Sequence, residues 1–385
     1  TTAQTTRSAF TLANGHVDAG AYEYRLYTAD AQGAGENWYL RSAAPVVSPI
    51  KPGQPPVAPV QVPTFRAEVP LLAAVPAQLR QADLAMLGNL HRRVGDELAP
   101  AAGAAAGDPS GGRQAWARAV YSDLDIRQEG PASAQSQGHV SGIQAGTDLL
   151  ASGAWRAGIY VGTLDGNANV VGNARGVIAS VGSNDLKSRF LGGYATWMDG
   201  DGLYADAVVQ GGRHSYTVQP YGNLNIDGKA SSLTASIEAG KAFALGEGWT
   251  IEPQAQLIHQ SMRFDDVLIG GALVTQDAGS GWIGRLGVRV KGDVMTAAGR
   301  LQPYGRFNVY RASSGTDVAT FIGPAAITPI ASPVGYTSTE VAAGMTLALT
   351  STTTLYGEVG QIYSAGGAAK VQSSLQGSIG MRLRW

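Results

Sequence analysis

Side chains that could carry out acid–base or nucleophilic chemistry are scattered through this sequence of 385 residues. Ser, His and Asp all occur, but the five histidines stand apart from one another: His16, His91, His139, His214 and His259. The chain has no cysteine, no run with the spacing of a metal site and no glycine-rich phosphate loop. We therefore expect no catalytic residue, no cofactor, no metal and no enzymatic activity.

The charged residues that do form a pattern lie on one face of segments that alternate like β-strands. In the last segment, Leu375, Ile379 and Met381 share one face, whereas Ser378 and Arg382 share the other. A polar face that carries both signs of charge suits a socket for a helix that also carries both signs. By this alternation the polar faces hold Glu238, Glu252, Glu340, Glu358, Arg285, Arg289, Arg306, Arg382 and Arg384.

A helix with both signs of charge is predicted over residues 76–98. Pro76 suits its first turn, and its length of roughly 33 Å is close to one bilayer thickness. Gly88 and Gly95 lie seven residues apart and would permit close approach to a wall. An ordinary surface helix is the alternative. The charged residues assigned to the helix are Arg80, Asp83, His91, Arg92, Arg93 and Asp96.

If the alternating segments close into a barrel with their polar faces inward, we expect this helix to lie in the lumen. Its charges would then pair with those of the inner wall. The helix arginines would meet the wall glutamates, and Asp83, Asp96 and Glu97 would meet the wall arginines. In the alternative arrangement, the wall charges pair only with each other across neighbouring strands.

The composition favours a membrane barrel. The net charge of −1 gives no reason to expect a nucleic-acid partner, and only 15% of residues are charged, against about 25% in soluble domains. No run of about 18 apolar residues could form a transmembrane helix, so a membrane protein with this sequence would have to be a closed barrel. Five tryptophans near the predicted strand ends would form an aromatic girdle: Trp155, Trp197, Trp249, Trp282 and Trp385.

About twelve β segments are predicted from residue 113 to the end of the chain. Short turns such as 199–202 alternate with longer loops such as 312–336, as in outer-membrane barrels. A soluble β-sandwich is the alternative, because alternation alone does not say which face points inward. The segments are 113–125, 137–150, 154–165, 188–198, 202–217, 229–244, 249–264, 281–292, 300–311, 337–350, 354–363 and 373–385.

The chain ahead of the barrel divides into four stretches. Residues 1–42 alternate like β-structure, and residues 43–75 are rich in proline and predict an extended linker. The helix at 76–98 and a small-residue loop at 99–112 follow, and the barrel occupies 113–385.

Three motifs carry a resemblance to a known family. Residues 378–385 end in alternating apolar residues and Trp385, like the last strand of outer-membrane barrels. Residues 113–118 (RQAWAR) resemble the opening strand of autotransporter barrels, and residues 20–26 (GAYEYRL) with 38–40 (WYL) resemble the closing segment of pertactin-like passengers. In this order, the motifs resemble the pertactin-like autotransporters over the whole chain. The resemblance implies an all-β membrane fold, namely a twelve-stranded antiparallel transmembrane β-barrel with one α-helix in the lumen, preceded by the end of a β-helix passenger.

The resemblance also implies a function at the bacterial outer membrane. The barrel would secrete its own N-terminal passenger and anchor it at the cell surface (type V secretion), with residues 1–42 as an autochaperone-like cap and Trp385 as an assembly signal. The implied partners are the passenger, outer-membrane lipids and lipopolysaccharide, the barrel-assembly machinery and periplasmic chaperones, with no nucleic acid. Asn89 is followed by Leu90, so self-cleavage at an Asn-Asn pair is not expected, and cyclisation at Asn89 is left open.

Three other functions are open to a chain of this kind. It could be a surface adhesin or virulence factor in which the barrel is mainly a membrane anchor. It could be a diffusion porin plugged by the helix, although a porin needs neither the linker nor the cap. An outer-membrane protease or lipase is the third alternative, and the lack of a nucleophile constellation argues against it.

Overall fold

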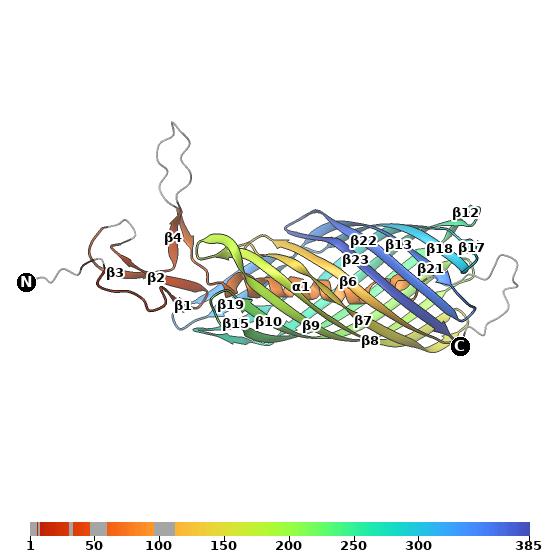
Figure 1. Ribbon diagram of the computed structural model, residues 1–385, viewed down its shortest axis with the longest axis horizontal. Coiled ribbons are helices and arrows are strands. Elements are labelled where there is room, and N and C mark those ends of the chain that lie inside the picture. The colour runs from red at the N-terminus through yellow and green to blue at the C-terminus, as the bar shows by residue number, and fades with distance from the viewer. Residues whose placement is uncertain (1–5, 7, 31–33, 47–59, 96–111) are drawn as a thin grey trace, which may run out of the picture.

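Twelve long antiparallel strands close into a barrel in the computed structural model (Figure 1), which describes residues 6, 8–30, 34–46, 60–95 and 112–385. The predicted fold class is confirmed, and each of the twelve predicted segments falls on one of these strands. The strands are β6 (Gln114–Gln128), β7 (Gln135–Ser152), β8 (Trp155–Ala174), β9 (Val177–Met198), β10 (Leu203–Pro220), β11 (Ile226–Lys241), β13 (Trp249–Phe264), β16 (Gly281–Lys291), β18 (Gly299–Ala312), β21 (Tyr336–Ala348), β22 (Thr353–Gly367) and β23 (Ala369–Arg384).

The last strand closes the barrel against the first. β23 pairs antiparallel with β6 from Arg384 opposite Gln114 to Ala369 opposite Gln128, with a register shift between Gln372 and Gln376. Because every long strand then has two neighbours, the barrel leaves no open edge in the plane of a membrane.

The two faces of the wall differ as the alternation predicts. Large aliphatic side chains point outward and are exposed, such as Ile379 at 70%, Leu286 at 69% and Leu191 at 63%. Trp155, Trp249, Trp282 and Trp385 are also exposed on the outer surface. An outward apolar band with aromatic residues is typical of a barrel that faces lipid.

The long loops at one end of the barrel carry strands of their own. β14 (Val267–Ile269), β15 (Ala272–Asp277), β19 (Thr316–Ile322) and β20 (Ile327–Pro333) form a four-stranded sheet. The longer loop predicted at 312–336 does connect β18 to β21, and it contains the hairpin of β19 and β20, which the sequence did not indicate. The hairpin was not predicted because proline is disfavoured inside β-sheets. Pro329 and Pro333 lie on the edge strand β20, where a missing N–H donor is tolerated.

Short strands extend two turns at the opposite end. β12 (Phe243–Gly246) pairs with β13, and β17 (Val294–Thr296) pairs with β18.

The lumen is threaded by α1 (Glu68–Leu87) and the short α2 (Leu90–Val94), which Figure 1 shows inside the ring of strands. The predicted helix at 76–98 is wrong in its bounds, because α1 begins eight residues earlier and stops at Gly88, whose φ of 62° is left-handed. Pro70 lies in the first turn, where no intrahelical partner is lost. Pro76 lies inside the helix rather than in its first turn. Asp96 and Glu97, and all of the predicted loop 99–112 except Gly112, lie outside the described residues.

Neither described helix is long and apolar enough to pass through a bilayer.

Ahead of the helix, β1 (Val17–Ala19), β2 (Tyr22–Thr28) and β3 (Trp38–Arg41) form a three-stranded sheet, which we call the cap. β4 (Ala43–Val46) and β5 (Val60–Pro63) pair with each other. The region predicted as an extended linker, 43–75, therefore contains a strand pair and the first turns of α1, while residues 47–59 lie outside the described part of the chain.

Candidate functional site

The interface between the two helices and the inner wall is the candidate functional site. α1 is buried almost all round, and α2 is buried at every residue. Toward the cap, the interface is largely apolar, with Asn184 of the wall donating to the Leu71 carbonyl at 2.9 Å. Leu71, Leu72 and Leu79 of α1 share one hydrophobic cluster with Leu164 and Val170 of the wall. The lumen is therefore apolar as well as polar, whereas the alternation predicted a polar inner face.

Asp83 of α1 lies in a buried hydroxyl and imidazole network. Its carboxylate accepts hydrogen bonds from Ser232 Oγ at 3.0 Å and Thr234 Oγ1 at 3.3 Å. His214 Nε2 lies 3.5 Å from the carboxylate, and its Nδ1 lies 2.8 Å from Ser188 Oγ. The predicted pairing of Asp83 with wall arginines is wrong. His214 also has neighbours that its isolation in the sequence did not indicate.

Arg80 bonds to the long loops rather than to the wall glutamates. Its Nη2 donates to Asp317 Oδ1 of β19 at 2.8 Å and to the Gly279 carbonyl at 2.8 Å. The predicted partner of Arg80 was wrong because the sheet formed by the loops was not foreseen. Arg80 thus ties α1 to the barrel mouth near the cap.

Wall side chains donate hydrogen bonds to the main-chain carbonyls of the helices. Arg118 Nη2 donates to the Met86 carbonyl at 2.7 Å, and its Nη1 donates to the Arg92 carbonyl at 3.1 Å. The last carbonyls of a helix have no intrahelical donor, so these bonds satisfy groups that burial would otherwise leave unpaired. Further wall donors to helix carbonyls are Asn184 to Leu71, Gln144 to Met86, Gln210 to Asp83, Gln260 to Arg80 and Tyr356 to Arg93, and Gln256 donates to the carbonyl of Gly88 between the helices.

Gly88 and Gly95 lie against the wall, as close approach requires. A Cβ atom at Gly88 would lie 3.1 Å from the Arg118 guanidinium, and one at Gly95 would lie 3.0 Å from the Tyr356 ring. Between them, Asn89 caps α2, because its side chain accepts a hydrogen bond from the Arg92 N–H at 2.8 Å.

The three basic residues of α2 each meet an acid of the wall. His91 Nε2 lies 2.8 Å from Glu252 Oε1, and Arg92 Nε lies 3.3 Å from Glu358 Oε1. Arg93 meets Asp206, which the sequence reasoning did not select. Its Nη2 donates to Asp206 Oδ1 at 2.7 Å, and its guanidinium lies 4.6 Å from the centre of the Tyr194 ring.

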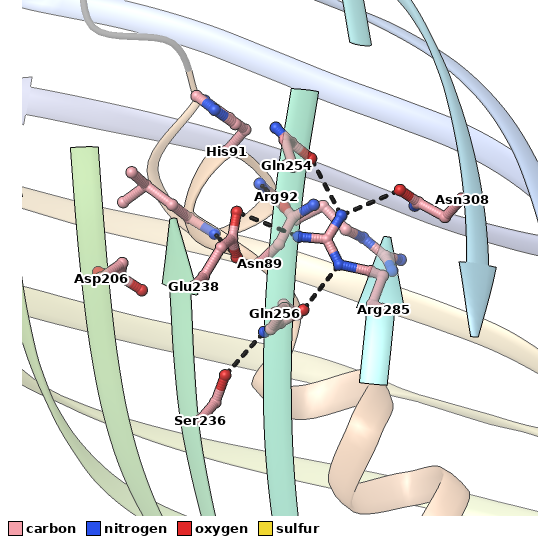
Figure 2. A network of polar contacts seen from close by, with 12 residues as sticks. Asn89, His91, Arg92, Asp206, Ser236, Glu238, Gln254, Gln256, Arg285 and Asn308 are labelled. Carbon is pink, nitrogen blue, oxygen red and sulfur yellow. Dashed lines mark hydrogen bonds and ion pairs between the residues drawn. The ribbon is translucent and has the colours of Figure 1, made fainter. Parts of the chain in front are cut away.

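The wall charges also bond to one another. Figure 2 shows Arg285 at the centre of a network on neighbouring strands, where it lies 3.2 Å from Glu238 and donates to Gln256 at 2.8 Å. Arg306 Nη2 bridges Glu340 at 3.1 Å and Glu358 at 2.7 Å. Glu358 therefore serves both a wall arginine and Arg92 of the helix, which combines the two arrangements that the sequence left open.

The remaining predicted wall residues also lie on the inner face or at its rim. The guanidinium of Arg289 is 4.0 Å from the centre of the Tyr304 ring. Arg382 is buried and Arg384 is half-buried.

The cap sits on the loops of the barrel. Glu23 of the cap accepts a hydrogen bond from Arg175 Nε, in the β8–β9 turn, at 2.8 Å. The Arg175 N–H donates to the Phe65 carbonyl at 2.8 Å, and the Gly20 N–H donates to the Gly271 carbonyl at 3.2 Å. Burial would raise the pKa of Glu23, but hydrogen bonds from Arg175 and Arg25 outweigh burial, so this pKa lies below its ordinary value.

An acidic cluster with a histidine lies in the cap, next to the start of α1. His16, Asp18 and Glu23 offer ligand atoms within 4.8 Å of one another. Arg66 Nη2 lies 3.7 Å from Asp18 and 2.8 Å from Glu68. Burial raises the pKa of Asp18 although Arg66 acts in the opposite direction. Because arginines already neutralise these acids, we assign no metal to the cluster.

Sequence reasoning missed several residues of the interface. Arg118 lies two residues from Trp116 on the same inward face and could have been found by the same alternation rule as Arg285. Asp206 and His214 were hidden because their inward neighbours on β10 include Tyr204 and Val208, so no polar face stands out on that strand.

Comparisons with known proteins agree with this architecture. The autotransporter β-domain family matches residues 115–360. The adhesin BmaC autotransporter of Brucella suis is 30% identical over 96% of this chain, and the pertactin autotransporter of Bordetella bronchiseptica is 30% identical over 90%. This chain spans only 11% of the length of the Brucella protein and 39% of that of pertactin.

Solved structures show the same fold. The β-domain of the Bordetella autotransporter BrkA superimposes with a TM-score of 0.56 at 22% identity, covering 71% of this chain and 100% of that one. The transport unit of AIDA-I from Escherichia coli gives a TM-score of 0.62 at 16% identity, covering 82% of this chain and 99% of that one. Since the family matches most of the chain and the wall presents an apolar band to lipid, the chain belongs to the autotransporter β-domain family and is an outer-membrane translocator with its N-terminal segment at the cell surface.

Proposed function

We propose that this barrel passes a particular N-terminal passenger through its lumen and then holds it at the surface by docking α1 and α2. The observation that carries the proposal is the helix pair, which leads from the cap into the lumen and is bound there by the wall. A chain drawn through the pore and retained by its tail would end in this arrangement. Residues 1–46 would then be the surface end of the passenger, and residues 68–94 its anchor.

The docked charges support a role in retention. Arg92 and Arg93 meet Glu358 and Asp206, and breaking a buried pair on one side leaves an uncompensated charge. Arg80, Asp83 and His91 add polar contacts along the same path. These residues are proposed to position the helix, with no part in chemistry.

Partners beyond the passenger follow from the location of the barrel. The chain would be inserted by the barrel-assembly machinery with the help of periplasmic chaperones, and its outer surface would contact outer-membrane lipids and lipopolysaccharide. Trp385 would act in insertion. We propose no enzymatic activity for the barrel.

A surface-display assay tests the proposal. An epitope tag with a signal peptide, fused ahead of residue 1, should become accessible to antibody and protease on intact Gram-negative cells. A matched variant that lacks β23 should leave the tag inaccessible, because the barrel cannot close. A tag that stays periplasmic although the barrel is folded in the outer membrane would refute secretion by this chain.

A second candidate, the adhesin with the barrel mainly as an anchor, has one observation in its favour. The Brucella relative is named an adhesin. A host-cell binding assay with and without the upstream passenger separates this activity from that of the barrel.

A further inference from the structure

Five basic residues form a patch on the outer surface of the barrel, which we call the basic patch. They lie on four adjacent strands, and all five side chains are exposed. The patch consists of Lys187 and Arg189 on β9, Arg213 on β10, Lys229 on β11 and Arg263 on β13.

The strand register brings these cations together. Arg189 and Arg213 are directly opposite each other. Lys229 is opposite Ser215, one outward position along from Arg213, and Arg263 is opposite Ser231, one outward position along from Lys229. Cβ atoms of opposite residues on one face lie about 5 Å apart, and like charges there are destabilising. Arg189 and Arg213 therefore repel each other, and an anion bound between them would relieve this repulsion.

Among the described residues, none lies within ion-pair or hydrogen-bond distance of the five basic side chains. Acids also lie near the patch. Asp165 is opposite Lys187 in register, the Asp265 N–H donates to the Lys229 carbonyl, and Asp185 and Asp227 lie one outward position beyond Lys187 and Lys229. None of these carboxylates lies within ion-pair distance of the five basic side chains. By contrast, the outward acids of β6 are engaged, since Asp123 accepts a hydrogen bond from Tyr121 and Asp125 accepts one from Gln372.

The basic patch lies at a defined level of the wall. On each strand, the outward positions on the side away from the cap hold exposed aliphatic residues, at Leu191, Val209, Leu233 and Leu257. The cations follow on the cap side of these residues, before the strands enter the long loops. Since the cap is at the cell surface, this is where the hydrocarbon of the outer leaflet gives way to its headgroups.

We propose that the basic patch binds the phosphate groups of a phosphorylated glycolipid in the outer leaflet, whose acyl chains lie along the neighbouring aliphatic residues. Guanidinium groups bind phosphate oxygens in a bidentate manner, and cations beside an anionic membrane surface each add to the attraction. The inference deepens the lipid contact proposed above and rests on the membrane orientation given there.

Binding of bisphosphorylated hexa-acyl lipid A to the full chain, purified in detergent, tests the proposal by native mass spectrometry. The triple variant Arg189→Gln, Arg213→Gln, Lys229→Gln should bind on the order of 100-fold more weakly, because each surface cation contributes about fivefold. The matched control is Arg311→Gln with Lys370→Gln, two exposed cations on β18 and β23, and it should bind like the parent chain. Enzymatically dephosphorylated lipid A should bind to the parent chain as weakly as bisphosphorylated lipid A binds to the triple variant.

Two results would overturn the assignment. One is equal binding by the triple variant and the control. The other is displacement of the lipid by an equal concentration of inorganic phosphate, which would indicate an unspecific anion site. Heat-dependent gel mobility of each variant, together with the surface-display assay, separates loss of lipid binding from failure of the barrel or of secretion.

Discussion

At the scale of single residues, the lumen shows how ionised groups are accommodated in a buried interior. Arg93 is fully buried yet lies against the Asp206 carboxylate and the Tyr194 ring. The ion pair fixes α2 against β10 at one defined position, because each buried charge would lack its counter-charge if the helix moved.

Replacing Arg93 with methionine should leave Asp206 buried without its cation. We expect destabilisation of about 3 kcal/mol, seen as a lower temperature for the heat-induced gel-mobility shift. The double variant Arg93→Met with Asp206→Leu removes both charges and should recover most of the loss. If the double variant is as unstable as the single variant, the ion pair is not the cause.

Acidification should loosen the cap from the barrel. The pKa of Glu23 is lower in the folded state than in the unfolded chain, so its contribution is complete above the ordinary glutamate pKa and is lost as the pH falls through the lowered value. Hydrogen exchange of residues 17–28 should therefore accelerate on acidification after correction for intrinsic rates. Arg175→Gln should increase exchange already at neutral pH. An unchanged acid dependence in that variant would assign the effect to another group.

Site residues could be predicted from the sequence on those strands where alternation separates a clearly polar face from an apolar one. Glu340, Arg285 and Arg306 were found because their strands have plainly polar faces. The partner of Asp83 was not found, because a pairing depends on how far α1 slides along the barrel and how it turns about its axis. The residue spacing within one strand determines neither the position of α1 along the barrel axis nor its rotation.

At the scale of elements, α1 is a polar and apolar insert held by two kinds of contact. Leu72 and Leu79 pack into the apolar cluster near the cap, and wall donors bond to carbonyls farther down. The start of α1 was misplaced from the sequence because Pro70 was assigned to the extended linker and Pro76 to the first turn of the helix. Burial of the helix against the wall outweighs the local preference of proline.

Removing residues 1–94 should leave a folded barrel with several-fold higher ion conductance in planar bilayers, because the helix occupies the lumen. Arg92→Glu with Arg93→Glu in the full chain should give a smaller, fluctuating increase, since like charges would then face Glu358 and Asp206. Arg127→Glu, an exposed residue of β6, is the control and should leave the current unchanged. Equal conductance with and without the helix in folded barrels would contradict its position in the lumen.

At the scale of the whole molecule, closure between β6 and β23 decides whether the barrel exists. This contact joins the first and last strands of the barrel, so it brings together residues from opposite ends of the barrel sequence. Trp385 continues the pairing, since its N–H donates to the Arg113 carbonyl at 3.0 Å, and its ring is 63% exposed on the outer face.

Replacing Trp385 with lysine should reduce the amount of folded barrel in the outer membrane much more than it changes the stability of barrels already formed. The exposed ring contributes little to packing, whereas a cation on the lipid-facing surface opposes insertion. The amount of heat-modifiable protein in outer-membrane fractions measures the effect, and Trp385→Phe should behave like the parent chain. Normal levels of the lysine variant would exclude a role for Trp385 in assembly.

The hydrogen bonds from Arg118, Gln144, Gln210 and Tyr356 to helix carbonyls have a consequence for evolution. A carbonyl group is the same in every amino acid, so these bonds do not depend on which residues the helix carries. Substitutions in the helix away from Gly88, Gly95 and the charged residues should therefore leave these backbone hydrogen bonds in place. Recombination that joins the coding sequence of this barrel and its helices to a different upstream sequence would preserve these hydrogen bonds. The same domain would then display a new protein on the cell surface.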